Sequence, residues 1–259
     1  MAGARNYRDL DLKRLCLLSQ NECYNPECDR KLIAKDCRTI TGKICHIEAA
    51  SPLGPRYNPT QTDEERHSFS NLILLCDECH SIVDNKDNVS LYPVSRLQAW
   101  KKAHEEGAFQ SKSREMVKSL PIVVDAIIDK VLVDNVEQGN TDVYNIESKI
   151  AFNQLNRNSF LIREYNLYSH TVDALYDELE SQGSIKKSIV LMRIHSMYLL
   201  IKGEGESDAD NIFDKVVEMI LHTVEDSSGN YDEVLLAVFV VVVHAFVECK
   251  ILEKPTHDN

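Results

Sequence analysis

The sequence has few of the features that mark fibrous, disordered or membrane proteins. Its 259 residues include only 9 Gly, 7 Pro and 1 Trp. These small numbers exclude a collagen-like or low-complexity chain, and 43% hydrophobic residues suffice for a packed core. The longest apolar run, Val234–Val247, covers 14 residues, whereas a membrane-spanning helix needs about 20. We therefore expect a globular protein with no membrane partner.

The opening segment, MAGARNYRDLDLKRL, has no apolar stretch ahead of a small-residue cleavage site. This absence predicts a cytoplasmic rather than a secreted protein. Cytoplasmic cysteines stay reduced, so clusters among the 8 Cys are expected to bind metal rather than to form disulfides.

Positive charge is scarce in the second part of the chain. Residues 1–115 contain 17 Lys+Arg and 17 Asp+Glu, whereas residues 116–259 contain 12 and 24. The whole net charge of -12 therefore lies in the second part, which would repel a polyanion. We predict two domains, residues 1–115 and residues 116–259, with any nucleic-acid function in the first.

The first part has the pattern of short strands joined by long loops. Turn-forming Pro and Gly punctuate residues 20–90, and short apolar runs lie at Ile44–Ala50 and Leu72–Leu75. A helix is predicted over Pro93–Glu106, with Gly107 as its end.

Two lysines on that predicted helix, Lys101 and Lys102, follow Trp100. We expect them on a solvated face, with phosphate contact as the alternative.

The second part repeats apolar residues every three or four positions. Such stripes cover residues 161–179, 190–201 and 212–224, and each indicates an amphipathic helix. None is long enough for a coiled coil between chains. By propensity Val234–Val247 could be a buried strand, but its helical surroundings favour a central helix in which His244 is a hydrogen-bonded core residue. The sequence therefore predicts an all-α bundle.

Four cysteines occur in two close pairs, Cys23 with Cys28 and Cys76 with Cys79. Two pairs of thiolates at such spacings suit tetrahedral Zn²⁺ in a structural site. So few hydrophobic residues lie between the pairs that metal binding would supply part of the folding energy. The alternative, isolated buried thiols, is expected for the cysteines at two other positions, Cys16 and Cys249.

Three further residues accompany the cysteines: His46 in KICHIEAA, Asn71 in FSNLILLCDECH, and His80 directly after the second pair. In this order and context, about residues 20–105 resemble the HNH endonuclease family. The resemblance implies a zinc-stabilised ββα-metal domain that hydrolyses phosphodiester bonds in DNA. Together with the helical bundle, it implies an α+β protein.

The resemblance makes His46 the general base, Asn71 the residue that holds the loop carrying His46, and His80 a ligand of a catalytic Mg²⁺ or Mn²⁺. An imidazole with a pKa near 6.5 can take a proton from water near neutral pH. A divalent cation can neutralise the charge of the phosphate.

The sequence departs from the family pattern at Cys45, where many members have an Asp that binds the metal. Cys45 could instead join the zinc site. Candidates for the missing catalytic ligand are three residues nearby, Glu48, His67 and Asp84, and a solvated surface side chain is the alternative for each.

The segment SPLGPRYNPTQTDEER resembles a loop of HNH proteins linked to prokaryotic defence. From it we predict a phosphate contact by Arg56, with Lys43 as a second. Alternatively, Arg56 pairs with an acidic neighbour, Asp63, Glu64 or Glu65.

The C-terminal segments SIVLMRIHSMYLLIKG, NIFDKVVEMIL and VLLAVFVVVVHAF resemble effectors of ABC three-component (Lamassu-like) antiphage systems. That resemblance implies an SMC-like ATPase and a small middle protein as partners. We expect the acidic helical part to mediate self-association or partner docking and to regulate the nuclease. Two alternatives stay open: a zinc-stabilised interaction module with an inactive HNH fold, and a nuclease directed at RNA.

Overall fold

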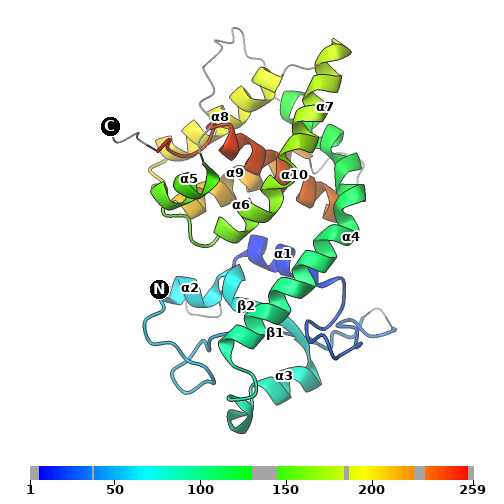
Figure 1. The fold of residues 1–259 in the computed structure, drawn as a ribbon, viewed down its shortest axis with the longest axis vertical. Coiled ribbons are helices and arrows are strands. Elements are labelled where there is room, and N and C mark those ends of the chain that lie inside the picture. Colours follow the sequence, from blue (N-terminus) through cyan, green and yellow to red (C-terminus); the bar gives the residue numbers. More distant parts are fainter. Residues whose placement is uncertain (1–5, 37, 130–144, 184–186, 225–230, 256–259) are drawn as a thin grey trace. The chain divides into compact units, whose positions relative to one another are not determined.

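The computed structural model describes residues 6–36, 38–129, 145–183, 187–224 and 231–255. Two compact units divide the chain, residues 1–112 and residues 113–259 (Figure 1). The described residues are mainly helical and include one two-stranded sheet, in keeping with an α+β class.

The first unit is built around a β-hairpin-like pair followed at once by a helix. Strand β1 (Gly42–His46) pairs antiparallel with β2 (Leu72–Cys76), and α3 (Asp77–Val83) starts at the next residue. Gly42 lies opposite Cys76, and His46 lies opposite Leu72. This register places the predicted base at one end of the pair and the second cysteine pair at the other. The remaining short elements of this unit are α1 (Asp9–Ser19), α2 (Asp63–His67), η1 (Phe69–Asn71) and η2 (Lys86–Asn88).

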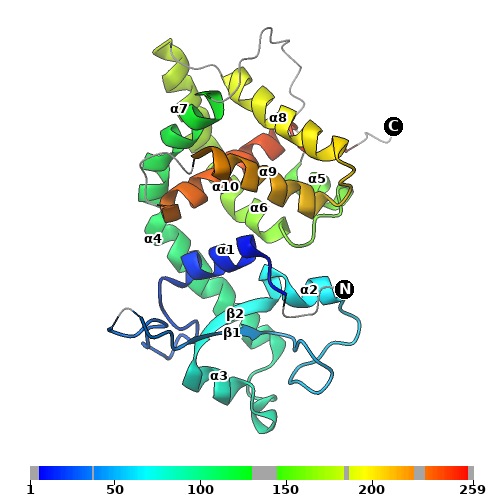
Figure 2. The same ribbon diagram turned by 180° about the vertical axis from the view of Figure 1, so that it is seen from behind.

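Strand β2 reads LILLC and is buried along its whole length. Helices α1 and α3 both contact it, and Figure 2 shows them on opposite sides of the strand pair. A strand covered on both faces needs apolar residues at every position rather than alternating ones. The sequence of β2 therefore suits its place at the centre of this unit.

Helix α4 (Val94–Asp129) is much longer than the predicted helix and does not end at Gly107. An interior Gly costs a helix only about 1 kcal/mol relative to Ala. Burial of Ala108 and Phe109 directly after it, and of Met116 further along, outweighs that cost. The predicted end at Gly107 is therefore wrong.

The prediction that Lys101 lies on a solvated face of α4 is also wrong. This side chain is buried, pairs with Glu105 at 2.5 Å and lies 3.6 Å from the centroid of the Phe69 ring. Phe69 thus provides a cation–π surface for the buried ammonium group. Lys102 is exposed, as predicted, and lies 3.6 Å from Glu106.

In the described residues of the second unit, all regular secondary structure is helical. The central helix predicted over Val234–Val247 is confirmed as α10 (Tyr231–Val247), which is buried from Val234 to Phe246. The helices that pack against it include α6 (Ser159–Asn166), α7 (Ser169–Ser181), α8 (Lys187–Gly203) and α9 (Ala209–Val224) (Figures 1 and 2). The unit also contains α5 (Ile146–Phe152).

The stripe predicted over residues 161–179 belongs to two helices, not one. The break falls at Leu167 and Tyr168, between α6 and α7. Both helices still turn the stripe inward, because Leu161, Tyr165 and Val172 are buried. The spacing of the apolar residues therefore indicates the buried face of both helices, but it does not reveal the short break between them.

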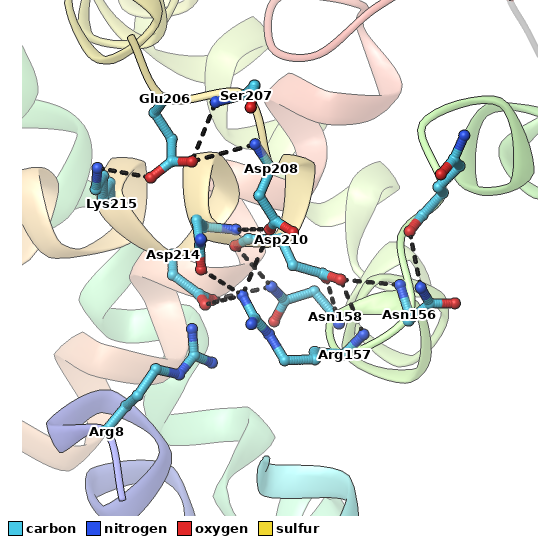
Figure 3. A network of polar contacts seen from close by, with 12 residues as sticks. Arg8, Asn156, Arg157, Asn158, Glu206, Ser207, Asp208, Asp210, Asp214 and Lys215 are labelled. Carbon is cyan, nitrogen blue, oxygen red and sulfur yellow. Dashed lines mark hydrogen bonds and ion pairs between the residues drawn. The ribbon is translucent and has the colours of Figure 1, made fainter. Parts of the chain in front are cut away.

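A carboxylate on α9 holds the start of α6 (Figure 3). Asp210 accepts hydrogen bonds from three consecutive backbone N–H groups, those of Asn156, Arg157 and Asn158, at 2.9–3.1 Å. The Arg157 guanidinium lies 3.5 Å from Asp214. Asp210 therefore ties the loop that leads into α6 to helix α9.

Among the helices that the structure describes, none combines the length and hydrophobicity needed to cross a membrane.

Candidate functional site

The four paired cysteines come together in the first unit. Cys23 and Cys28 lie in the loop after α1, Cys76 ends β2, and Cys79 is in the first turn of α3. Their sulfur atoms all lie within 4.8 Å of one another. The two pairs meet because the loop that carries Cys23 lies against β2, where the Tyr24 N–H donates to the carbonyl oxygen of Leu74 at 3.0 Å.

The surroundings of the sulfurs suit thiolates bound to a metal. The backbone N–H of Cys76 donates to the Cys23 sulfur at 3.4 Å, and that of Cys79 donates to the Cys76 sulfur at 3.5 Å. Burial raises the pKa of the Cys23 thiol to about 11, so a bound cation would be needed to hold it as a thiolate. The donor set of four clustered sulfurs fits Zn²⁺ in a structural site.

Three other described cysteines, Cys16, Cys45 and Cys249, lie outside this cluster. Cys45 is buried, and its thiol points to the backbone oxygen of Lys43 at 3.4 Å. Burial, and next the charge of Asp84, raise the pKa of Cys45 well above its ordinary value. Its sulfur is not one of the four that cluster, so the alternative in which Cys45 joins the zinc site is not the arrangement observed. Cys16 is exposed, so its expected burial is wrong.

Asn71 joins two backbone segments next to the end of β1. Its amide donates to the carbonyl oxygens of Glu48 at 2.9 Å and Arg66 at 2.8 Å, and its Oδ1 accepts from the Glu48 N–H at 2.9 Å. The backbone oxygen of Asn71 also accepts from the Ile47 N–H at 2.9 Å. Asn71 therefore fixes the two residues that directly follow His46.

His46 and His80 line one cavity of about 360 Å³. His46 comes from the end of β1 and His80 from α3, and Asp84 lies one turn beyond His80. The His80 side chain is 35% exposed, so it can meet a solute in the cavity. Tyr7 forms another wall, with its ring centroid 5.7 Å from that of His46. Nothing in the sequence around Tyr7 indicates this position, because it precedes the resembling region.

Of the three candidate extra ligands, only Asp84 lines this cavity. Its Oδ2 lies 3.2 Å from His80 Nε2. Glu48 instead accepts a hydrogen bond from Gln61 at 2.6 Å, and His67 is buried. The i,i+4 spacing of His80 and Asp84, which places both on one helix face, is the sequence signal for this pair.

The two predicted phosphate contacts differ in their surroundings. Lys43 lines the cavity with a half-exposed side chain and lies 3.4 Å from Asp77. The Arg56 side chain is only 2% exposed and contacts Asp84 at 2.7 Å. A buried, fully engaged guanidinium does not reach a phosphate in solvent, so the expectation for Arg56 is corrected. The alternative pairing with Asp63, Glu64 or Glu65 is also not the one observed.

A second group of possible ligands lies in the second unit. His244 is buried and its Nε2 lies 3.0 Å from Asp173 Oδ1, with Glu248 nearby. The ammonium group of Lys187 contacts both carboxylates, at 2.7 and 3.1 Å. Lys187 already supplies a positive charge at the place that a metal ion would take. The prediction of His244 as a hydrogen-bonded core residue is confirmed.

Comparison with known proteins gives one match. Residues 118–253 match the family model described as C-terminal domain 10 of the ABC-three component (ABC-3C) systems. No curated protein and no solved structure matches the chain. The match covers about half of the chain and falls wholly within the second unit.

Proposed function

Because the chain belongs to the family with C-terminal domain 10 of the ABC-three component systems, we propose that it is the nuclease effector of such a system in defence against phage. The first unit would be an HNH (ββα-metal) endonuclease that hydrolyses phosphodiester bonds in DNA. The second unit would dock this nuclease to its partners. An SMC-like ATPase and a small middle protein are the partners that we propose, together with self-association of this chain.

One observation carries the nuclease proposal: His46 and His80 share a cavity, in a strand–strand–helix unit that also clusters four cysteines. In this proposal His46 takes the proton from the attacking water, because neutral imidazole is a base near pH 7. Asn71 holds the backbone after His46, so the imidazole stays aligned with the cavity.

The donors beside the cavity fit a small divalent cation. His80 Nε2 and Asp84 Oδ2 are 3.2 Å apart, close enough to bind one ion together. Mg²⁺ is commonly held by one or two protein ligands plus waters and substrate phosphate oxygens, so two donors are sufficient. When bound, Mg²⁺ or Mn²⁺ would neutralise the phosphate and stabilise the leaving oxygen. Lys43, at the rim of the same cavity, would attract the DNA backbone.

The test is cleavage of a supercoiled plasmid by the whole protein over a range of Mg²⁺ and Mn²⁺ concentrations. We expect metal-dependent nicking that His46→Ala abolishes with zinc content and helicity unchanged. His170→Ala is the matched control, because His170 is exposed and lies in the second unit. Cleavage by His46→Ala at the wild-type rate would contradict the proposed base. A single-stranded RNA substrate in parallel separates DNA from RNA cleavage.

Cys45 supports a second candidate, a zinc-stabilised interaction module without catalysis. Its buried thiol stands where many HNH enzymes have a metal-binding Asp and cannot replace that carboxylate. This candidate predicts that the protein binds its partners and cleaves no nucleic acid, with or without them. Cleavage by the purified complex with any divalent cation would eliminate it.

A further inference from the structure

Arg56 has an unusual backbone conformation for its residue type. Its φ is 58°, in the left-handed region that residues other than Gly seldom adopt. The side chain is 2% exposed, although Leu53 in the same loop is 82% exposed. Both the strained backbone and the burial of a charged group cost free energy, so the surrounding contacts must hold Arg56 in place.

The guanidinium donates three hydrogen bonds to the frame of the cavity. Nε donates to the carbonyl oxygen of Ile47 at 2.8 Å, directly after the proposed base. Nη1 donates to the carbonyl oxygen of Val83 at 2.9 Å, and Nη2 to Asp84 Oδ1 at 2.7 Å. Arg56 therefore ties the segment after β1 to the end of α3, which are the two elements that present His46 and His80.

The contact with Asp84 determines how its carboxylate is oriented. Oδ1 accepts from Arg56, and Oδ2 lies 3.2 Å from His80 Nε2. Without Arg56, the carboxylate of Asp84 would lose one of these two contacts, and its side chain would rotate more freely. A planar guanidinium that donates to three acceptors in fixed directions restricts this rotation much more than a single hydrogen bond does.

We propose that Arg56 is a positioning residue that fixes Asp84 as the second protein ligand beside His80. This inference rests on the cation site of the proposed function. Partners that orient metal ligands in this way commonly change metal affinity about 10- to 100-fold when they are removed. Arg56 would thus act through Asp84 and would contact neither the cation nor the DNA.

Charge alone predicts the opposite effect of removing Arg56. A guanidinium next to Asp84 partly cancels its negative charge, so its loss would strengthen cation binding if only electrostatics mattered. If Arg56 acts by orienting Asp84, its loss weakens binding. The sign of the change therefore distinguishes the two roles.

Arg66 offers a matched control in the same segment. It is also buried, and it donates to the carbonyl oxygens of Asn58 and Gln61 at 2.9 and 2.7 Å. Its hydrogen bonds do not include one to Asp84. Substituting Arg66 removes a buried guanidinium from this loop and leaves the orientation of Asp84 intact.

The experiment measures Mn²⁺ affinity of the zinc-loaded full chain by calorimetry, with His80→Ala to assign the site. We expect Arg56→Gln and Arg56→Lys to weaken binding about tenfold or more, and Arg66→Gln to leave it within about twofold. In an Asp84→Asn background, Arg56→Gln should have little further effect, because Arg56 acts through Asp84. Circular dichroism checks the folding of each variant, and Arg56→Lys serves if Arg56→Gln does not fold.

Unchanged or tighter Mn²⁺ binding by a folded Arg56 variant would overturn the inference and leave the proposed function intact. An equal loss in Arg66→Gln would overturn it too, because the effect would then follow from loop disruption. Absence of any His80-dependent Mn²⁺ binding in the wild-type chain would overturn the cation site, and this inference with it.

Discussion

At the scale of single residues, candidate metal ligands that are close together in the sequence could be predicted. The cysteine pairs and the i,i+4 spacing of His80 and Asp84 are local patterns, and the structure brings each set together. The role of Arg56 could not be predicted in this way. Its three acceptors lie between 9 and 28 positions away along the chain, and only the folded loop decides whether a guanidinium points to solvent or inward.

Zinc binding gives the residue-scale prediction. Cys28→Ser removes one of the four sulfurs, so we expect zinc content to fall from about one per chain and the first unit to lose stability. Cys16→Ser is the control, because Cys16 is exposed and outside the cluster. Elemental analysis after dialysis and thermal unfolding measure both effects. Full zinc occupancy in Cys28→Ser would show that the cluster is not the zinc site.

At the scale of elements, periodicity located α6, α7, α8 and α9 of the second unit but not all of their ends, and it did not indicate α5. Helix ends depend on packing and on contacts from distant parts of the chain, such as those between Asp210 and the loop that leads into α6. Gly107 is a clear case, since a glycine that could end a helix lies inside α4.

Gly107→Ala tests the continuity of α4. A Cβ at Gly107 would meet nothing within 4 Å, and Ala is the better helix former. We expect the free energy of unfolding to rise by about 0.5–1 kcal/mol in urea titrations. If α4 instead ended at Gly107 in a left-handed conformation, the same substitution would lower the free energy of unfolding, because Ala is strained in that conformation.

Because Lys149 on α5 is buried, we predict that the stability of the second unit depends on pH. Its ammonium donates to the carbonyl oxygens of Phe246 and, at 3.1 Å, of Ile251, and burial lowers its pKa to about 8 from an ordinary 10.5. The folded state therefore releases this proton at lower pH than the unfolded state does. The cost of burying the charge is fully present below pH 8 and disappears as pH rises to about 10.5, a change on the order of 3 kcal/mol.

We expect the wild-type chain to gain stability relative to Lys149→Met across this pH range, measured by urea unfolding. Lys118→Met, at an exposed position, should show no such trend. A constant difference between wild type and Lys149→Met from pH 7.5 to 10.5 would contradict the lowered pKa.

At the scale of the whole molecule, the uneven charge predicts weak DNA binding without partners. The second part of the chain holds the net charge of -12, which repels a polyanion. Reversing two exposed acidic residues, Asp177→Lys on α7 with Glu218→Lys on α9, should tighten binding of a short duplex several-fold at ~0.05 M salt. The gain should shrink by ~0.3 M salt because of screening. If the double variant and the wild type bound the duplex equally tightly at low salt, the acidic charge of the second part would not be what weakens DNA binding.

The central claim is that one cavity holds both the base and the cation. Its most direct test is an anomalous difference map from crystals of the whole chain grown with Mn²⁺ and recorded at the manganese absorption edge. The account predicts a peak between His80 and Asp84, in the cavity that His46 lines. No peak there at a Mn²⁺ concentration that supports cleavage, or a peak only at Asp173, His244 and Glu248, would contradict it.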